Sequence, residues 1–269
     1  MTEELPPTVS ELPGVIIMGK RVLFFYGINL LITFIFAMIF GGVLGSIKGN
    51  ELILGMIVTM GVQLSLIVTS LIYRKKYHEK RNYNYNFNKY IVLSVIIPVI
   101  VFLLSSFCLD LLNINYVPTE FKNMIFVIAI ITTIIGSVSE EIGWRGALLP
   151  IFEKKYTPFI SSLFVGLLWG AWHFFKISTV GILGYILFIP SIVMYSVLIS
   201  YIYNKSSKSI LNPIVFHSFI NICSILLIYE RECIEFYIIS FVISIIAIIL
   251  LYLFDKNYFI LKKVKCSKD

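Results

Sequence analysis

Charged residues are scarce in this sequence. Asp, Glu, Lys and Arg make up 14% of its 269 residues, whereas 58% are hydrophobic, and the mean hydropathy is +0.91. Cysteine is also rare, and the four cysteines (Cys108, Cys223, Cys233 and Cys266) form no CxxC pair or other ligand spacing. A cysteine-based metal site is therefore not indicated, and unpaired thiols or packing residues are the simplest interpretation.

Long uncharged runs fill most of the chain. A run such as IVLSVIIPVIVFLLSSF is continuously apolar instead of alternating, so its backbone must form hydrogen bonds within a helix, and a membrane barrel is excluded. Runs of about 20 residues are long enough to cross a bilayer. The sequence predicts an all-α, polytopic integral membrane protein with about eight transmembrane helices: 22–46, 52–73, 90–112, 122–144, 158–176, 180–203, 213–229 and 234–254.

Basic residues predict the orientation and the division of the chain. The net charge of +7 is scattered over membrane loops without aromatic interleaving, which favours positive-inside orientation over a nucleic-acid partner. The loop 74–89 is strongly basic, whereas the segment 230–235 is acidic. We therefore expect a cytosolic leader (1–20), a single transmembrane domain (21–254) and a basic cytosolic tail (255–269), with both termini in the cytosol.

Ionisable residues interrupt one predicted span at SVSEEIGWRG, residues 137–146. Such residues cost about 2.5 to 3.5 kcal/mol each at the centre of a bilayer, so they usually mark function. Glu141 and Arg145 are four residues apart and are predicted to pair, whereas Glu140 is rotated by about 100° on the helix. The pattern leaves Glu140 free for chemistry, although the pair alone could be structural.

Other polar residues in the spans could act with this carboxylate. His217 and Asn221 share a helix face because they are four residues apart. His173 is predicted at a depth similar to that of Glu140 on the next helix. A hydrolase needs a general base, a group that orients water and donors for an oxyanion, and these four residues can supply all three.

Three blocks, EEIGWR, WGAWH and HSFIN, lie in this order within residues 137–221. They resemble the EExxxR, FxxxH and HxxxN/D motifs of the CPBP family, the CAAX-protease and bacteriocin-processing intramembrane proteases. One departure is visible, because Trp169 stands where the family has Phe. That exchange puts packing in doubt and leaves the chemistry intact, and Trp169 and Trp172 are interpreted as packing or interface residues.

The resemblance implies an intramembrane endopeptidase acting near the cytosolic face. Glu140 would be the general base, His173 would help position the water, and His217 with Asn221 would stabilise the oxyanion. The ion pair of Glu141 would support them. Expected substrates are membrane-associated proteins, either lipidated CAAX proteins or propeptides such as bacteriocin precursors. The Ile-, Lys- and Asn-rich composition favours a prokaryotic cell membrane and, with it, a propeptide.

Several alternatives stay open at this point. Two imidazoles and a carboxylate could hold zinc, but the sequence has no HExxH and these ligands come from three helices, so we expect no cofactor and keep zinc as the alternative. A non-catalytic scaffold, such as an immunity or regulatory partner protein, could use the same polar cluster for packing. A transporter is disfavoured because we find no inverted repeat.

Overall fold

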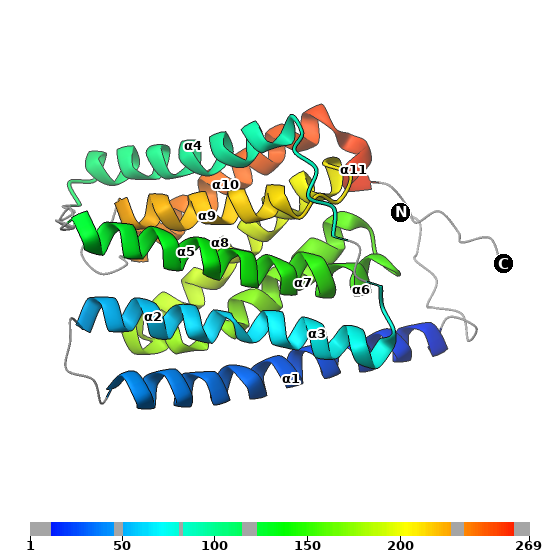
Figure 1. Cartoon of the computed structure of the whole chain (residues 1–269). Coiled ribbons are helices and arrows are strands. Elements are labelled where there is room, and N and C mark those ends of the chain that lie inside the picture. The colour runs from blue at the N-terminus through cyan, green and yellow to red at the C-terminus, as the bar shows by residue number, and fades with distance from the viewer. Residues whose placement is uncertain (1–11, 46–50, 81–82, 115–122, 227–233, 261–269) are drawn as a thin grey trace.

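The computed structural model describes residues 12–45, 51–80, 83–114, 123–226 and 234–260, and in this part it is a bundle of helices without a strand (Figure 1). This confirms the predicted fold class. The helices are α1 (Leu12–Gly45), α2 (Glu51–Gln63), α3 (Ser65–Tyr77), α4 (Tyr90–Leu111), α5 (Asn123–Gly143), α6 (Leu149–Glu153), α7 (Pro158–Trp172), α8 (Ile177–Lys205), α9 (Leu211–Leu226), α10 (Ile234–Phe254) and α11 (Lys256–Ile260). Between them lie the π-helical turn Trp144–Leu148 and the 3₁₀ turn Phe174–Lys176.

Six helical stretches in the described part are long and apolar enough to cross a membrane. They are 14–43, 51–77, 90–111, 124–153, 174–205 and 234–254. The other two predicted spans form the shorter apolar helices α7 and α9. The polytopic membrane architecture is therefore confirmed, while two of the eight predicted helices are shorter than expected.

The distribution of polar residues is typical of a membrane protein. Large apolar side chains such as Leu23, Met38 and Phe107 are 60% or more exposed, and they form an outer surface that suits lipid. Serines, both acidic residues of the central motif and Arg145 are buried. Because lipid satisfies no hydrogen bonds, these polar groups must find partners inside the bundle.

Helix ends differ from the predicted ones at three places. α1 begins at Leu12, ten residues before the predicted span, because Pro13 is tolerated in a first helical turn. α7 ends at Trp172, and the backbone of His173 leaves the helical region (φ −79°, ψ 24°). α9 begins at Leu211, two residues before the predicted span, and neither amide atom of Asn212 has a hydrogen-bond partner among the described residues.

The basic loop after α3 is tied to the bundle at one end. The amide N–H of Ile210 donates to the carbonyl oxygen of Asn84 at 2.7 Å, and the hydroxyl of Ser209 donates to the carbonyl of Asn86 at 2.9 Å. Arg74 donates to the carbonyl of Gly146 inside the π-helical turn. The loop is thus joined to the segment before α9, and α3 is joined to the π-helical turn that follows both acidic residues.

Candidate active site

The two carboxylates lie at the end of α5, just before the π-helical turn. Glu140 is 1% exposed and Glu141 is 0% exposed, so both are removed from solvent. Trp144 and Arg145 follow them by four residues and each bonds back to one carboxylate. Single π-helical turns within α-helices are frequent at functional sites.

Glu140 accepts three hydrogen bonds from three helical segments. Its Oε1 accepts from Nε2 of Gln63 on α2 at 2.7 Å. Its Oε2 accepts from the indole Nε1 of Trp169 on α7 at 2.6 Å and of Trp144 at 3.3 Å. All three partners are N–H donors, so both carboxylate oxygens act as acceptors. Two donors occupy Oε2, which leaves Oε1 with a remaining lone pair.

Glu141 joins two other predicted site residues. Its Oε1 accepts from Arg145 at 3.0 Å, so the predicted ion pair is present. The same oxygen lies 2.8 Å from Nδ1 of His217 on α9. From the sequence, His217 is expected to act together with Asn221. In the structure His217 contacts Glu141 instead, and Nδ2 of Asn221 donates to Oγ of Ser137 at 3.4 Å. A carboxylate that holds the Nδ1 side of an imidazole fixes its orientation, as in hydrolase triads.

His173 lies where α7 ends, close to Trp169. Its Nδ1 is 2.9 Å from the carbonyl oxygen of Trp169. A carbonyl can only accept, so Nδ1 carries the proton, and in the neutral ring Nε2 has the lone pair. The ring centroid of His173 lies 5.3 Å from that of Phe188 and 5.5 Å from that of Phe175. An aromatic surround thus fixes the plane of this imidazole.

Trp169 contacts or adjoins nearly every predicted site residue. Besides its bond to Glu140, its ring centroid lies 5.0 Å from the ring of His217 and 6.1 Å from that of His173. The guanidinium carbon of Arg145 lies 4.9 Å from the same ring centroid. The interpretation of Trp169 as a packing residue is therefore incomplete, because its indole N–H also belongs to the site.

Gln63 and Trp144 were missed by the sequence reasoning. Trp144 offered a signal, since it lies four residues after Glu140 on the same helix. Gln63 offered only its polarity inside an apolar span, and its partner is 77 residues away. The contact depends on Gly136, because a Cβ there would lie 2.0 Å from Oε1 of Gln63. The missing side chain at Gly136 thus allows α2 and α5 to approach closely here.

A cavity of about 540 Å³ lies beside the site between α2, α5 and α9. Gln63, Asn221, Glu51 and Lys176 line it with polar groups. The remaining lining is rich in hydroxyl groups and aliphatic carbon: Leu52, Gly55, Met56, Thr59, Ala129, Thr132, Thr133, Ser224 and Ile225. The cavity therefore extends from Gln63 towards the first turn of α2, away from the basic loop after α3.

Zinc is the alternative that the sequence leaves open. Among the described residues, no group of three or more His, Cys, Asp or Glu side chains is placed to hold one. Of the three ligands considered from the sequence, Glu140 accepts three N–H donors, whereas His217 and His173 are bonded through Nδ1. We therefore derive no chemical step that uses zinc.

Comparisons with known proteins agree with the motifs. Residues 122–223 match a family model described as type II CAAX prenyl endopeptidase Rce1-like. Over 124 residues the chain is 28% identical to a CAAX prenyl protease 2 of Methanococcus maripaludis. That alignment covers 42% of this chain and 44% of the relative, so it spans less than half of each protein. Both comparisons support the CPBP/Rce1-like family that the three motifs indicate.

Proposed function

We propose that this chain is an intramembrane endopeptidase. The premise is that residues 122–223, which carry most of the candidate site, match the Rce1-like family model. The observation that carries the proposal is the buried Glu140 carboxylate, which three N–H donors hold beside a cavity. Glu140 itself does not line the cavity, but its Oε1 retains a lone pair beside Gln63, a residue that does.

Glu140 acts as the general base in this proposal. Its Oε1 takes a proton from a water molecule while the water oxygen attacks the carbonyl carbon of the scissile peptide bond. The carbonyl π bond breaks and its oxygen becomes an oxyanion. When the intermediate collapses, the C–N bond breaks and the proton held by Glu140 passes to the leaving nitrogen. Glu140 is then ionised again, and the products are a carboxylic acid and an amine.

The two imidazoles and Asn221 assist in distinct ways. His173 carries its proton on Nδ1, so Nε2 can accept a hydrogen bond from the attacking water and orient it. His217 is oriented by Glu141 through Nδ1, and with the amide of Asn221 it stabilises the oxyanion. Arg145 balances the charge of Glu141.

The proposed substrate is a segment of a membrane-associated protein that enters the cavity in extended form. A volume of about 540 Å³ lies within the range of ligand pockets. The curated relative is named for prenylated CAAX proteins, and a lipidated protein or a propeptide fits the same cleft. The cavity runs towards Glu51, at the end opposite the basic loop, so we propose that the substrate approaches from that end of the bundle or from the lipid beside it. This approach differs from the one near the cytosolic face that the sequence predicts.

Peptide hydrolysis is tested by comparing peptide termini in membranes from cells that express wild type, Glu140→Gln or no protein, at matched levels. We expect new termini with wild type alone. Both oxygens of Glu140 accept hydrogen bonds, so a glutamine amide would meet one donor unfavourably, and this variant has to be checked for folding. His173→Phe is the second variant, because it removes Nε2 and retains an aromatic ring among aromatic neighbours.

A scaffold would behave differently from a protease in this experiment. A non-catalytic scaffold would give identical peptide termini in all samples. Both variants would also keep whatever effect the wild-type protein has on the cells. The metal-free mechanism is tested on purified protein with a strong chelator, where we expect activity to persist. Loss of activity with EDTA and its recovery with zinc would overturn that assignment.

A further inference from the structure

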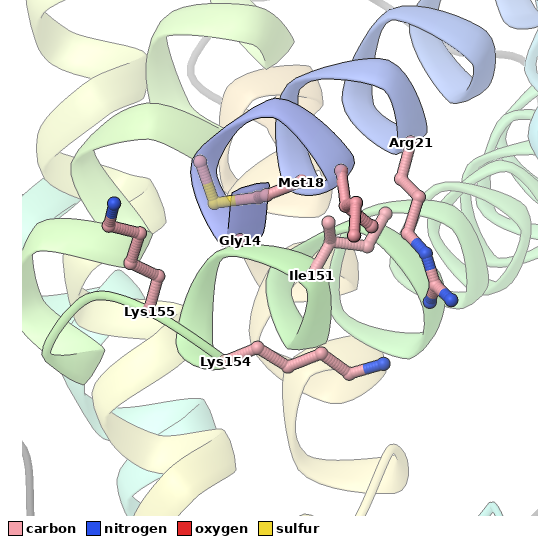
Figure 2. A pocket seen from close by; sticks show the side chains of 7 residues that line it. Gly14, Met18, Arg21, Ile151, Lys154 and Lys155 are labelled. Carbon is pink, nitrogen blue, oxygen red and sulfur yellow. The ribbon is translucent and has the colours of Figure 1, made fainter. Parts of the chain in front are cut away.

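A second cavity lies at the end of the bundle opposite the cavity described above (Figure 1). It has a volume of about 490 Å³ and lies between the first turns of α1 and the turn that joins α6 to α7 (Figure 2). Aliphatic side chains and three cations line it: Gly14, Ile17, Met18, Arg21, Ile151, Lys154 and Lys155. The mechanism proposed above uses none of these residues.

The charges around this cavity do not cancel. Arg21 and Lys154 each lie 2.8 Å from Oε1 of Glu79, and hydrogen bonding to Lys154 is the main effect that lowers the pKa of Glu79. Figure 2 shows Arg21 and Lys154 at one side of the pocket and Lys155 at the other. Three cations against one carboxylate leave two positive charges in excess. Arg21 and Lys154 also have further N–H groups beyond those directed at Glu79.

Exposed apolar surface adjoins this cationic pocket. Ile16 and Ile17 are each 55% exposed and Leu23 is 74% exposed, and Ile17 itself lines the pocket. These residues belong to α1, which lies at the edge of the bundle in Figure 1 and is one of the stretches apolar enough to cross a membrane. A ligand in the pocket would thus contact cations and a lipid-facing apolar surface together.

We propose that this cavity binds the headgroup of an anionic phospholipid, with the phosphate among Arg21, Lys154 and Lys155 and the acyl chains along the exposed face of α1. A soluble phosphate ester would use the cations only and would leave Ile17, Met18 and Ile151 without a role. Basic pockets between transmembrane helices are known to suit anionic lipid headgroups. A phospholipid satisfies both halves of the pocket.

Lipid retention by the purified, full-length protein tests this proposal. The protein is mixed with phosphatidylglycerol or phosphatidylcholine in detergent micelles, and bound lipid is counted by native mass spectrometry. Lys155→Gln removes one lining charge and leaves both bonds to Glu79 in place. Lys75→Gln is the matched control, since Lys75 is exposed and does not line the cavity.

We expect preferential retention of phosphatidylglycerol, weakened about fivefold by Lys155→Gln, because one lysine near an anionic lipid contributes about 1 kcal/mol. The Lys154→Gln/Lys155→Gln double variant should lose about 25-fold, and Lys75→Gln should match wild type. Equal retention of both lipids would overturn the proposal, as would equal losses in Lys155→Gln and Lys75→Gln. Displacement of phosphatidylglycerol by millimolar inorganic phosphate would instead identify a site for soluble anions and likewise overturn it.

Discussion

Replacing Trp169 by phenylalanine removes one hydrogen bond and retains an aromatic ring. The lost bond joins indole Nε1 to Oε2 of Glu140 at 2.6 Å and is the shortest of the three bonds to that carboxylate. A hydrogen bond to a charged group contributes about 1.5 to 3 kcal/mol. If the bond holds Glu140 in its reactive position, Trp169→Phe slows cleavage by about 10- to 150-fold.

Trp172→Phe is the matched control for this change. Trp172 is as buried as Trp169, lies on the same helix, and donates its indole N–H to the hydroxyl of Thr33 at 2.9 Å. The control therefore loses a bond to a neutral acceptor, which costs about 0.5 to 1.5 kcal/mol of stability. Activity per folded molecule should stay near that of wild type. Trp144→Phe, which loses the longer 3.3 Å bond to Glu140, should fall between the two.

The assay is cleavage of a substrate identified from the terminal-peptide comparison, measured in proteoliposomes with the thermal unfolding temperature of each variant. The expected order of rates is wild type, Trp172→Phe, Trp144→Phe, Trp169→Phe. If Trp169→Phe cleaves as fast as Trp172→Phe and both unfold at the same temperature, the indole bond has only a packing role. The assignment of Trp169 to the site would then be wrong.

Three further predictions concern the same bundle. Arg145→Met leaves Glu141 charged in a buried site and should lower the free energy of unfolding by about 3 to 5 kcal/mol; thermal unfolding checks this, and a loss below about 1 kcal/mol would contradict it. Gly136→Ala should push Gln63 aside and break its bond to Glu140, so cleavage falls about tenfold, as in Gln63→Leu, and the free energy of unfolding falls by about 1.5 to 3 kcal/mol; unchanged cleavage would show that the bond from Gln63 is dispensable. Hydrogen bonding to Lys154 lowers the pKa of Glu79, so the ionised Glu79 stabilises the fold above its ordinary pKa of about 4.3, and this stabilisation is lost as the pH falls through the lowered pKa. The free energy of unfolding, measured from pH 6 to pH 3, should therefore fall less in Glu79→Gln than in wild type. Parallel curves for the two proteins would refute the linkage.

The sequence by itself determined the fold class of the protein and pointed to most residues of the candidate site. Continuous apolar runs admit only helices in lipid, and the scarcity of charge made Glu140, Glu141 and Arg145 conspicuous. The pairing of Arg145 with Glu141 followed from helical spacing alone. These inferences succeed because they depend on periodicity and on the cost of burying charge, both of which are local properties.

Only the tertiary structure decided which groups meet across helices. In the structure, His217 lies against Glu141, and the indole N–H of Trp169 donates to Glu140. Gln63 also donates to Glu140, because Gly136 has no side chain that would block the approach. No spacing in the sequence encodes these contacts, because they depend on the relative rotation and depth of separate helices. The cationic pocket at the start of α1 likewise exists because packing brings two segments, more than 120 residues apart in the sequence, to the same end of the bundle.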